Sequence, residues 1–290
     1  MVTISDKQSR LEHPTRVVLK TEYLNQSHLS HSIIDKQFSC AGTSFSIISK
    51  AQPDVVSLAL QSIKNGESAA AIPFELLTPS AIFFDMDATV IAEESLVEIA
   101  KSVGKEREID EITAKAMAGG MDFKESLRLR LAILKGIHRN QILSVIPTLS
   151  HGMKQLADWC HKNEIPMFLV SGGFVDLAGP VSHSLGFEDF KANRFAWSDD
   201  EMAGHVEGEI IDAAGKRDAV KDWCKVHHLE PSRCICVGDG ANDRLMMEIC
   251  GLAVGFKPKK ALWPSLHVAN HTGDHRFLLD ALMPEKNENV

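Results

Sequence analysis

Four short apolar runs from residue 81 onward set the expected fold. They cover residues 81–85, 165–171, 233–240 and 252–256, and a polar residue or glycine closes or follows each run. Near-continuous apolar runs separated by helical patterns are typical of a parallel sheet that is buried on both faces. The pattern therefore predicts an α/β fold with a Rossmann-like parallel sheet.

The stretch between the first two runs is too long for a single crossover helix. Three segments in it have helical periodicity and end at glycines, namely 92–103, 105–118 and 122–135. Asp122, followed three positions later by Glu125, has the pattern of a helix N-terminus. We expect a helical cap over residues 92–148, inserted after the first strand. A smaller insert over 193–211 has the pattern of a β-hairpin.

The first 78 residues have a weaker pattern and form a separate N-terminal region in this prediction. Residues 16–20 and 44–49 are candidate strands, and 54–65 is a candidate helix that Gly66 ends. From about residue 80 onward the pattern is sharper. We therefore divide the chain into residues 1–78 and a core over residues 79–290.

Composition excludes several classes of protein. Hydrophobic residues make up 44% and charged residues 24% of the 290 positions, which are ordinary globular values. The net charge of −8 argues against a protein that mainly grips nucleic acid. The lack of a long apolar run predicts no membrane span, and the polar start predicts no secretion signal. Six scattered cysteines do not form a disulfide framework, so we expect a cytoplasmic protein.

Polar residues gather where the predicted strands end. They are Asp85, Asp87, Ser171, Gly172, Asp239 and Asn242. Ligands of open α/β sheets bind at the carboxyl ends of the strands, so this coincidence is the first functional signal. Each motif alone also has a plain structural explanation, and only the combination favours a site.

The first two motifs combine carboxylates with a small-residue turn. Asp85 and Asp87 lie two positions apart, so their side chains point to the same side of an extended chain. Such a pair can bind a divalent cation, or serve as nucleophile and proton donor, although an isolated pair is more often a solvated loop. Ser171 with Gly172 and Gly173 could offer backbone N–H groups to an anion, or form a tight turn.

The other two motifs add a cation and further acids. Lys216 lies near a predicted helix start, where a cation opposes the helix dipole unless it reaches an anion. The alternative is an ordinary surface lysine. The segment 238–243 supplies Asp239, Asn242 and Asp243 after a buried strand, and these residues could complete a site for a hard metal ion.

In this order the four motifs resemble the haloacid dehalogenase superfamily of aspartate-nucleophile phosphatases. Longer stretches are similar to its phosphoserine phosphatase family: DMDATVIAEESLVEIA, ITAKAMAGGMDFKESLRLRLAILKG, LVSGGF, GDGANDRLMM and KPK. The resemblance covers roughly residues 80–283. Bacterial members often carry a regulatory N-terminal domain of the ACT kind, and residues 1–78 have about the right size for one.

The resemblance implies a role for each core residue. Asp85 would be the nucleophile that becomes an aspartyl-phosphate, and Asp87 the general acid and base. Mg²⁺ would be held by Asp85, the backbone carbonyl of Asp87 and Asp239, with Asp243 in support. Ser171, the Gly172 N–H and Lys216 would bind phosphate, and Asn242 would help to orient the site.

The cap would choose the substrate. Glu94 matches the family carboxylate that receives the substrate ammonium, and Arg130 the arginine that binds its carboxylate. Phe123 lies seven positions, or about two helical turns, before Arg130, so both share an apolar stripe while Arg128 faces solvent. Phe123 and Met117 match apolar residues that close over the substrate, although Met117 has cap-core packing as an equal alternative.

The implied function is Mg²⁺-dependent hydrolysis of O-phosphoserine, the last step of serine biosynthesis. Phosphohomoserine or phosphothreonine are alternative substrates, and a non-catalytic regulatory protein on the same fold is an alternative class. We expect a small-molecule partner and no nucleic acid or membrane, and the assembly is open between monomer and homodimer. Ala88 stands where the family usually has serine, and we expect activity to survive this change.

Two groups of residues are predicted to have no functional role. Cys234 and Cys236 lie inside an apolar run and are interpreted as buried strand residues. His267, His271 and His275 have no recognisable ligand spacing and are interpreted as surface residues.

Overall fold

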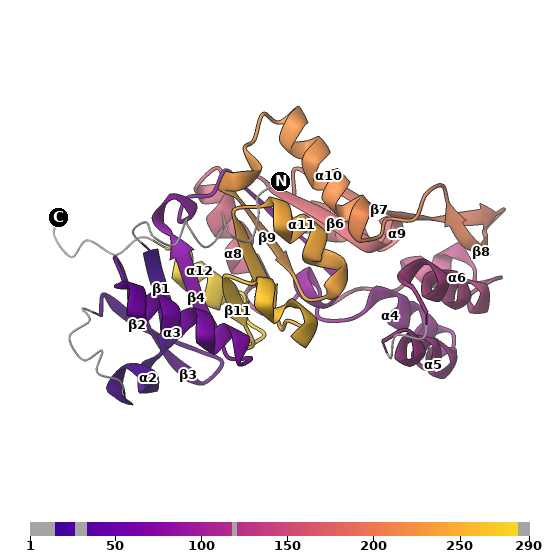
Figure 1. Ribbon diagram of the computed structural model, residues 1–290. Helices are drawn as coiled ribbons and strands as arrows, with labels where there is room; N and C mark the ends of the chain where they lie inside the picture. Colours follow the sequence, from indigo (N-terminus) through magenta and orange to yellow (C-terminus); the bar gives the residue numbers. More distant parts are fainter. Residues whose placement is uncertain (1–14, 27–33, 118–120, 284–290) are drawn as a thin grey trace.

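The computed structural model describes residues 15–26, 34–117 and 121–283, and its strands form one continuous sheet. Within these ranges the sheet has eleven strands in the order β2-β3-β1-β4-β11-β10-β9-β5-β6-β7-β8. Figure 1 shows the N-terminal elements at one end of the molecule and the cap helices at the other. The expected catalytic strand ends therefore lie between two peripheral units.

The middle of the sheet is parallel, as the apolar runs predict. Its strands, from β11 through β7, all pair in parallel. They are β11 (Val268–Asn270), β10 (Leu252–Phe256), β9 (Cys234–Gly238), β5 (Ala81–Phe84), β6 (Met167–Phe174) and β7 (Asp189–Ser198). Every residue of β5, β9 and β10 is buried, which explains their uninterrupted apolar sequences.

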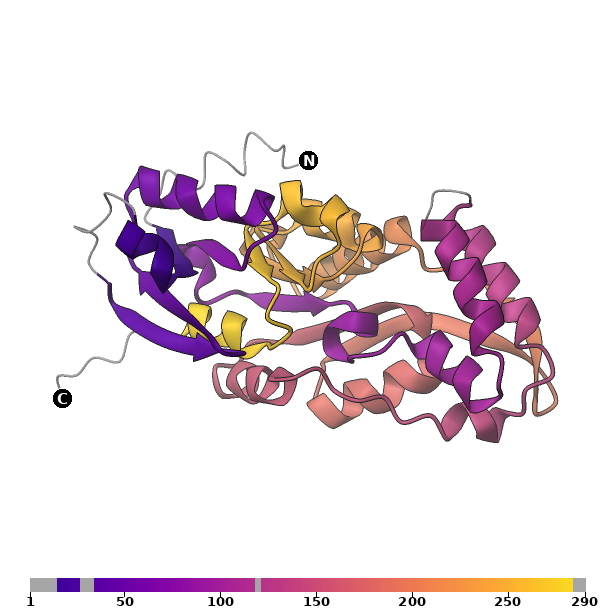
Figure 2. The same cartoon turned by 90° about the horizontal axis from the view of Figure 1, so that it is seen from below.

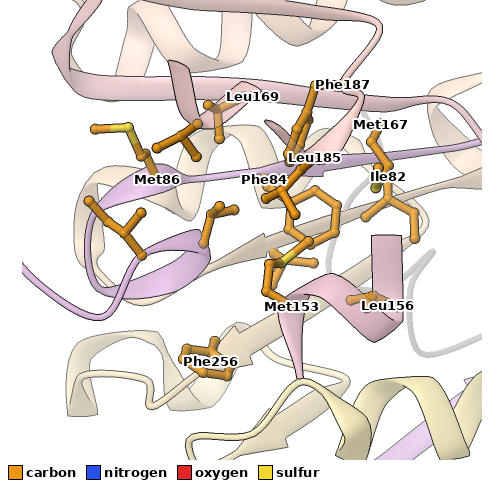
Figure 3. Close-up of a cluster of buried hydrophobic side chains, with 14 of the residues drawn as sticks. Ile82, Phe84, Met86, Met153, Leu156, Met167, Leu169, Leu185, Phe187 and Phe256 are labelled. Carbon is orange, nitrogen blue, oxygen red and sulfur yellow. The ribbon is translucent and has the colours of Figure 1, made fainter. Parts of the chain in front are cut away.

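Helices cover both faces of this sheet (Figure 2). Strand β5 contributes alternate side chains to the two faces. Ile82 and Phe84 join the cluster of α8 (Met153–Lys162), α9 (Val175–Leu185) and α12 (Arg276–Leu282), part of which Figure 3 shows. Ala81 and Phe83 join the other cluster, which includes α3 (Pro53–Lys64), α10 (Ala213–Val226) and α11 (Arg244–Ile249). These two apolar layers hold the end of β5, and so Asp85, in place.

The cap consists of helices between β5 and β6 together with the hairpin of β7 and β8. Its elements are α4 (Ser95–Ser102), α5 (Glu106–Met117), α6 (Phe123–Ile133), α7 (Arg139–Leu143) and β8 (Glu201–Glu207). The first helix starts three residues later than predicted. The Ala92 N–H donates to the carbonyl of Thr148 at 2.9 Å, so residues 92–94 belong to the extended entry to the cap.

The described part of the N-terminal unit has four strands and two α-helices in the order β1-α2-β2-β3-α3-β4. It contains β1 (Thr15–Lys20), α2 (Thr21–Gln26), β2 (Lys36–Cys40), β3 (Thr43–Ile48), α3 (Pro53–Lys64) and β4 (Ala69–Pro73). The order β2-β3-β1-β4 with antiparallel pairing is that of a split βαβ fold. The strands predicted at 16–20 and 44–49 and the helix predicted at 54–65 are confirmed. Sequence analysis missed β2, β4 and β11.

Strand β4 joins the two units into one sheet. It pairs antiparallel with β11 through Ala70 with Val268 and Ala69 with Ala269. The Arg16 guanidinium on β1 also donates to the carbonyls of Ala281 and Met283 at 3.1 and 2.6 Å. The boundary near residue 79 is thus crossed by backbone hydrogen bonds. Within the described ranges, no helix is both long and apolar enough to cross a bilayer.

Candidate active site

Asp85 is the first residue after β5 and lies buried at the carboxyl end of the sheet. Its side chain Oδ1 accepts a hydrogen bond from the Met86 N–H at 2.7 Å. The chain then turns sharply, and Ala88 adopts a left-handed conformation with φ of 53°. Burial raises the pKa of Asp85 well above its usual value, and the nearby Asp243 carboxylate is the next largest cause. Asp85 therefore needs positive charge beside it to act as an anion.

Lys216 supplies that charge. Its Nζ lies 2.6 Å from Asp85 Oδ1 and 2.7 Å from Asp243 Oδ1, and the side chain is 1% exposed. Burial alone would lower the pKa of Lys216, but the two carboxylates hold it above its usual value. These contacts explain a cation in the first turns of α10 (Ala213–Val226), because the lysine reaches away from its helix to two acids.

The loop after β9 brings two further carboxylates to the same place. Asp243 Oδ2 accepts the backbone N–H groups of Asp239 and Gly240 at 3.1 and 3.0 Å, which folds the loop back on itself. Gly238 is required here, since a Cβ atom at that position would lie 2.4 Å from Asp243 Oδ2. Burial, together with Asp243, raises the pKa of Asp239 to about 6.

The three acids fit a hard divalent cation. Asp85, Asp239 and Asp243 each offer a carboxylate oxygen, and these oxygens lie within 4.8 Å of one another. Carboxylate oxygens are the ligands that Mg²⁺ prefers, and a cation among them would relieve the repulsion that adds to the effect of burial on the pKa values of Asp85 and Asp239. Sequence analysis predicted all three residues at this site.

The motif of Ser171, Gly172 and Gly173 lies in an irregular stretch of β6. The pairing register with β7 shifts between Val170 and Phe174. Within this stretch the Ser171 hydroxyl accepts the Gly173 N–H at 2.8 Å. The Asn193 amide donates to the Gly172 carbonyl at 2.8 Å and accepts the Ile211 N–H at the same distance. Asn193, which sequence analysis missed, thus fixes the backbone beside Gly172.

Asp87 is held by the first residue of the cap. Its Oδ1 accepts the Ser95 N–H and its Oδ2 accepts the Ser95 hydroxyl, each at 3.1 Å. Burial, followed by the charge of Glu94, raises the pKa of Asp87 to about 7. A carboxyl with this pKa can give and take a proton near neutral pH. Sequence analysis missed Ser95, since a serine at a helix start is an ordinary signal.

The cap places an arginine toward these acids. Arg130 is partly buried; burial lowers the pKa of Arg130, and the charges of Glu94 and Asp87 oppose that change. Its Nε donates to the Ser126 carbonyl at 3.4 Å. Arg128 is exposed, as the helical phase predicted. The ring of Phe123 packs close to Gly172 of the core, since a Cβ atom at Gly172 would lie 3.0 Å from Phe123 Cζ.

Lys259 links the acidic loop to the cap, a contact that sequence analysis missed. Its Nζ lies 2.9 Å from Asp239 Oδ2 and 3.9 Å from Glu94 Oε1. Its backbone N–H donates to the Asp239 carbonyl at 2.8 Å. The KPK motif that ends at Lys259 supported the family resemblance, but no local pattern indicated which acids this lysine contacts.

Two other predicted site residues lie at the margin. Asn242 is partly buried in the acidic loop, and its Oδ1 would lie 2.5 Å from a Cβ at Gly240. Met117 is the last residue of α5, and its side chain lies outside the described part of the structure. The role of Met117 therefore stays a prediction.

The surface assignment was wrong for two histidines. His275 is 1% exposed, its Nε2 lies 2.9 Å from the carbonyl of Thr89, and its ring stacks on Phe256. Burial lowers the pKa of His275 to about 4. His267 is also buried, and its Nδ1 accepts the Ala253 N–H at 3.0 Å. The error arose because β11, which lies between them, was missed. Cys234 and Cys236 are buried in β9 as predicted.

Comparison with known proteins identifies the family. The model for haloacid dehalogenase-like hydrolases matches residues 82–248, more than half of the chain. The chain belongs to this family. A phosphoserine phosphatase of Albidiferax ferrireducens is 36% identical to this hydrolase over 222 residues, which cover 74% of this chain and 94% of the relative.

Solved structures agree with this assignment. A phospho-aspartyl intermediate analogue of a phosphoserine phosphatase is 30% identical, with a TM-score of 0.66 over 70% of this hydrolase and 98% of that chain. A haloacid dehalogenase family hydrolase of Salmonella enterica has a TM-score of 0.81 and covers 95% of this chain and 99% of its own. Its identity of 23% shows shared fold alone, which includes the N-terminal unit.

Proposed function

We propose that this hydrolase cleaves O-phosphoserine to serine and inorganic phosphate, the last step of serine biosynthesis. The observation that carries the proposal is a pair of opposite charges close to Asp87, with Arg130 on the cap and Glu94 at the entry to it. The charge of Glu94 acts on both Asp87 and Arg130, and the charge of Asp87 also acts on Arg130. A small zwitterion offers a carboxylate and an ammonium to such a pair. The relative and the structure named phosphoserine phosphatase support the same substrate.

Asp85 is the proposed nucleophile. A carboxylate oxygen of Asp85 forms a bond to phosphorus while the bond from phosphorus to the serine oxygen breaks, which leaves an aspartyl-phosphate. Water then breaks the new bond and releases phosphate. Lys216, at 2.6 Å from Asp85, offsets the repulsion between a carboxylate and a phosphate dianion.

Mg²⁺ is the proposed cofactor of this site. Asp85, Asp239 and the backbone carbonyl of Asp87 would hold the ion, and Asp243 would support them through its bonds to the loop. When bound, the ion supplies positive charge that lets an anionic nucleophile approach a phosphate. Both oxygens of Asp243 are already engaged, Oδ1 by Lys216 and Oδ2 by the backbone of the loop, which leaves Asp85 and Asp239 as the principal carboxylate ligands.

Asp87 is the proposed general acid and base. It donates a proton to the departing serine oxygen in the first step and accepts a proton from the attacking water in the second. A pKa raised to about 7 suits both directions, because neither form is strongly favoured at neutral pH. Ser95 donates to both oxygens of the carboxyl and so fixes its orientation.

The proposed phosphate site lies at the end of β6. The Ser171 hydroxyl, the Gly172 N–H and the Lys216 ammonium would donate to phosphate oxygens, and Asn242 would help to orient the acidic loop. Ser171 Oγ accepts the Gly173 N–H, so its own proton is available to a ligand.

The proposed amino-acid site lies under the cap. Glu94 would receive the substrate ammonium, Arg130 its carboxylate, and Phe123 with Met117 would cover it. This pair argues against sugar phosphates. Phosphothreonine and phosphohomoserine remain alternatives, because one methylene changes binding by only about 1–3 kcal/mol.

The N-terminal unit is proposed to be regulatory, with residues 1–78 as an ACT-like domain and 79–290 as the catalytic part. The antiparallel split βαβ order supports this. Calorimetric titration of an Arg130→Ala variant with amino acids would detect a second binding site.

We also propose a cytoplasmic location, which the absence of disulfides among all six cysteines supports. The homodimer stays a prediction that sedimentation would test.

A panel of phosphomonoesters tests the function. With Mg²⁺, phosphoserine should be hydrolysed with a higher kcat/KM than phosphothreonine, phosphohomoserine or glucose 6-phosphate, and chelation should remove the activity. A preference for phosphothreonine or phosphohomoserine would keep the chemistry and change the substrate. No turnover of any ester in the presence of Mg²⁺ would favour the non-catalytic alternative.

A further inference from the structure

Each carboxylate of the acidic cluster has an ammonium partner. Lys216 lies between Asp85 and Asp243, fully buried, while Lys259 contacts Asp239 at 2.9 Å from the solvent side. The two lysines differ in burial, because the side chain of Lys259 is 46% exposed and that of Lys216 only 1%. The first is part of the catalytic machinery proposed above, whereas the second has no assigned role.

The backbone fixes where Lys259 starts. Its N–H donates to the Asp239 carbonyl at 2.8 Å, and its carbonyl accepts the Leu262 N–H at 2.9 Å. The preceding Pro258 carbonyl accepts the indole N–H of Trp263 at 3.0 Å. The main chain is thus tied to the acidic loop, while the half-exposed ammonium can move into water. Asp239, whose side chain is 7% exposed, has no such freedom.

A divalent cation and the Lys259 ammonium compete for the same carboxylate. A bound Mg²⁺ takes a carboxylate oxygen at about 2.1 Å, and two cations on one carboxylate repel each other. Since Asp239 is buried and Lys259 is half-exposed, the lysine is the group that leaves. The same movement takes the ammonium away from Glu94, which lies 3.9 Å from it.

We infer that Lys259 is a resident counter-ion that sets the metal affinity of this site: it neutralises Asp239 in the metal-free protein and is displaced when the divalent cation binds. This rests on the proposed Mg²⁺ site at the same carboxylates. Metal binding breaks one ion pair, so the affinity is lower than the three acids alone would give. In return the metal-free site is spared part of the repulsion among its carboxylates.

Displacement also exposes the substrate-binding charge of the cap. In the metal-free protein the Lys259 ammonium lies between Asp239 and Glu94, so it screens both. Once it moves into water, Glu94 is available to an incoming ammonium. Metal binding and readiness for an amino-acid substrate are thereby linked through one side chain.

The test compares Lys259→Met with Lys260→Met in the full-length protein freed of metal. Lys260 is the exposed neighbour and serves as the matched control. Titration calorimetry with Mg²⁺ should give Lys259→Met a Kd about 5-fold lower than wild type, the size expected for one partly exposed ion pair. Without metal, its thermal unfolding midpoint should fall below that of wild type. Lys260→Met should match wild type in both measurements.

Charge rather than packing should explain the result. Lys259→Arg keeps the charge and should retain wild-type Mg²⁺ affinity, whereas Lys259→Gln should follow Lys259→Met and replaces it if that variant does not fold. Unchanged or weaker Mg²⁺ binding in the neutral variants, or equal tightening in Lys259→Arg, would overturn the inference. Failure of wild type to bind Mg²⁺ at all would instead overturn the proposed metal site.

Discussion

Ser95 donates to both carboxylate oxygens of Asp87, one from its backbone and one from its hydroxyl, each at 3.1 Å. Ser95 is also the first residue of α4, so the cap begins at the residue that orients the proposed acid. The position of this helix and the orientation of the Asp87 carboxyl are therefore coupled. A change in the position of α4 should affect the proton-transfer step.

Ser95→Ala should lower kcat by about fivefold with little change in KM, because it removes one neutral hydrogen bond to Asp87 and keeps the backbone one. Steady-state kinetics with phosphoserine and Mg²⁺ would measure this. Ser102→Ala is the control at the far end of the same helix, where the hydroxyl caps the Ile99 carbonyl. An equal loss of kcat in both variants would point to a general weakening of α4.

Asp85→Asn should abolish turnover and keep the fold, because an amide cannot form the phosphorylated intermediate. The variant should also unfold no more easily than wild type without metal, since Asp85 is a buried acid whose charge is disfavoured there. Beryllium fluoride should bind wild type at Asp85 and not the variant. Near-wild-type turnover of Asp85→Asn would falsify the mechanism.

Arg130→Ala should reduce kcat/KM for phosphoserine about 30- to 1000-fold, which corresponds to roughly 2–4 kcal/mol for a lost charge-assisted bond. Hydrolysis of p-nitrophenyl phosphate should change little, because that ester has no carboxylate. Glu94→Gln should likewise reduce the hydrolysis of phosphoserine more than that of p-nitrophenyl phosphate, because it weakens the contact with the substrate ammonium.

Arg128→Ala is the matched control for Arg130, since it lies on the same helix and faces solvent. It should behave as wild type on both esters. If Arg130→Ala loses activity equally on both, the arginine has a structural role and the substrate assignment loses its main support.

His275 should make stability depend on pH. Burial lowers its pKa from 6.5 to about 4 in the folded protein. Above pH 6.5 the ring is neutral in both states and stability is unaffected. As pH falls from 6.5 toward 4, only the unfolded chain gains the proton, so the free energy of unfolding falls by about 1.4 kcal/mol per pH unit.

Urea unfolding at pH 7.5 and pH 5 would measure this contribution. His275→Gln keeps a donor for the Thr89 carbonyl and removes the titration, so its loss of stability between the two pH values should be smaller by about 2 kcal/mol. The comparison with wild type cancels the other histidines. An identical pH dependence in both proteins would show that His275 does not titrate with folding.

The sequence indicated those parts of the site that local patterns encode. Asp85 and Asp239 follow buried strands, and helical phase separated Arg130 from Arg128. Ser95 and Lys259 could not be found in this way. Lys259, for example, acts on an acid twenty positions earlier, and only the fold brings the two together.

The N-terminal end of the sheet was harder to predict for a similar reason. Strand β4 reads AAAIP, which has almost no β-branched or aromatic residues, and it is a strand because it is buried between β1 and β11. The burial of His275 also depends on distant segments, because its ring contacts Thr89 and Phe256. Neither property can be read from the local sequence.

The shared sheet has a consequence for how the chain unfolds. Strand β11 has β10 on one side and β4 on the other. Without residues 1–78 its backbone groups on the β4 side would form an open edge, which invites pairing with another molecule. The two units should therefore melt together, and the catalytic part in isolation should be prone to aggregate, although no N-terminal residue takes part in the proposed chemistry.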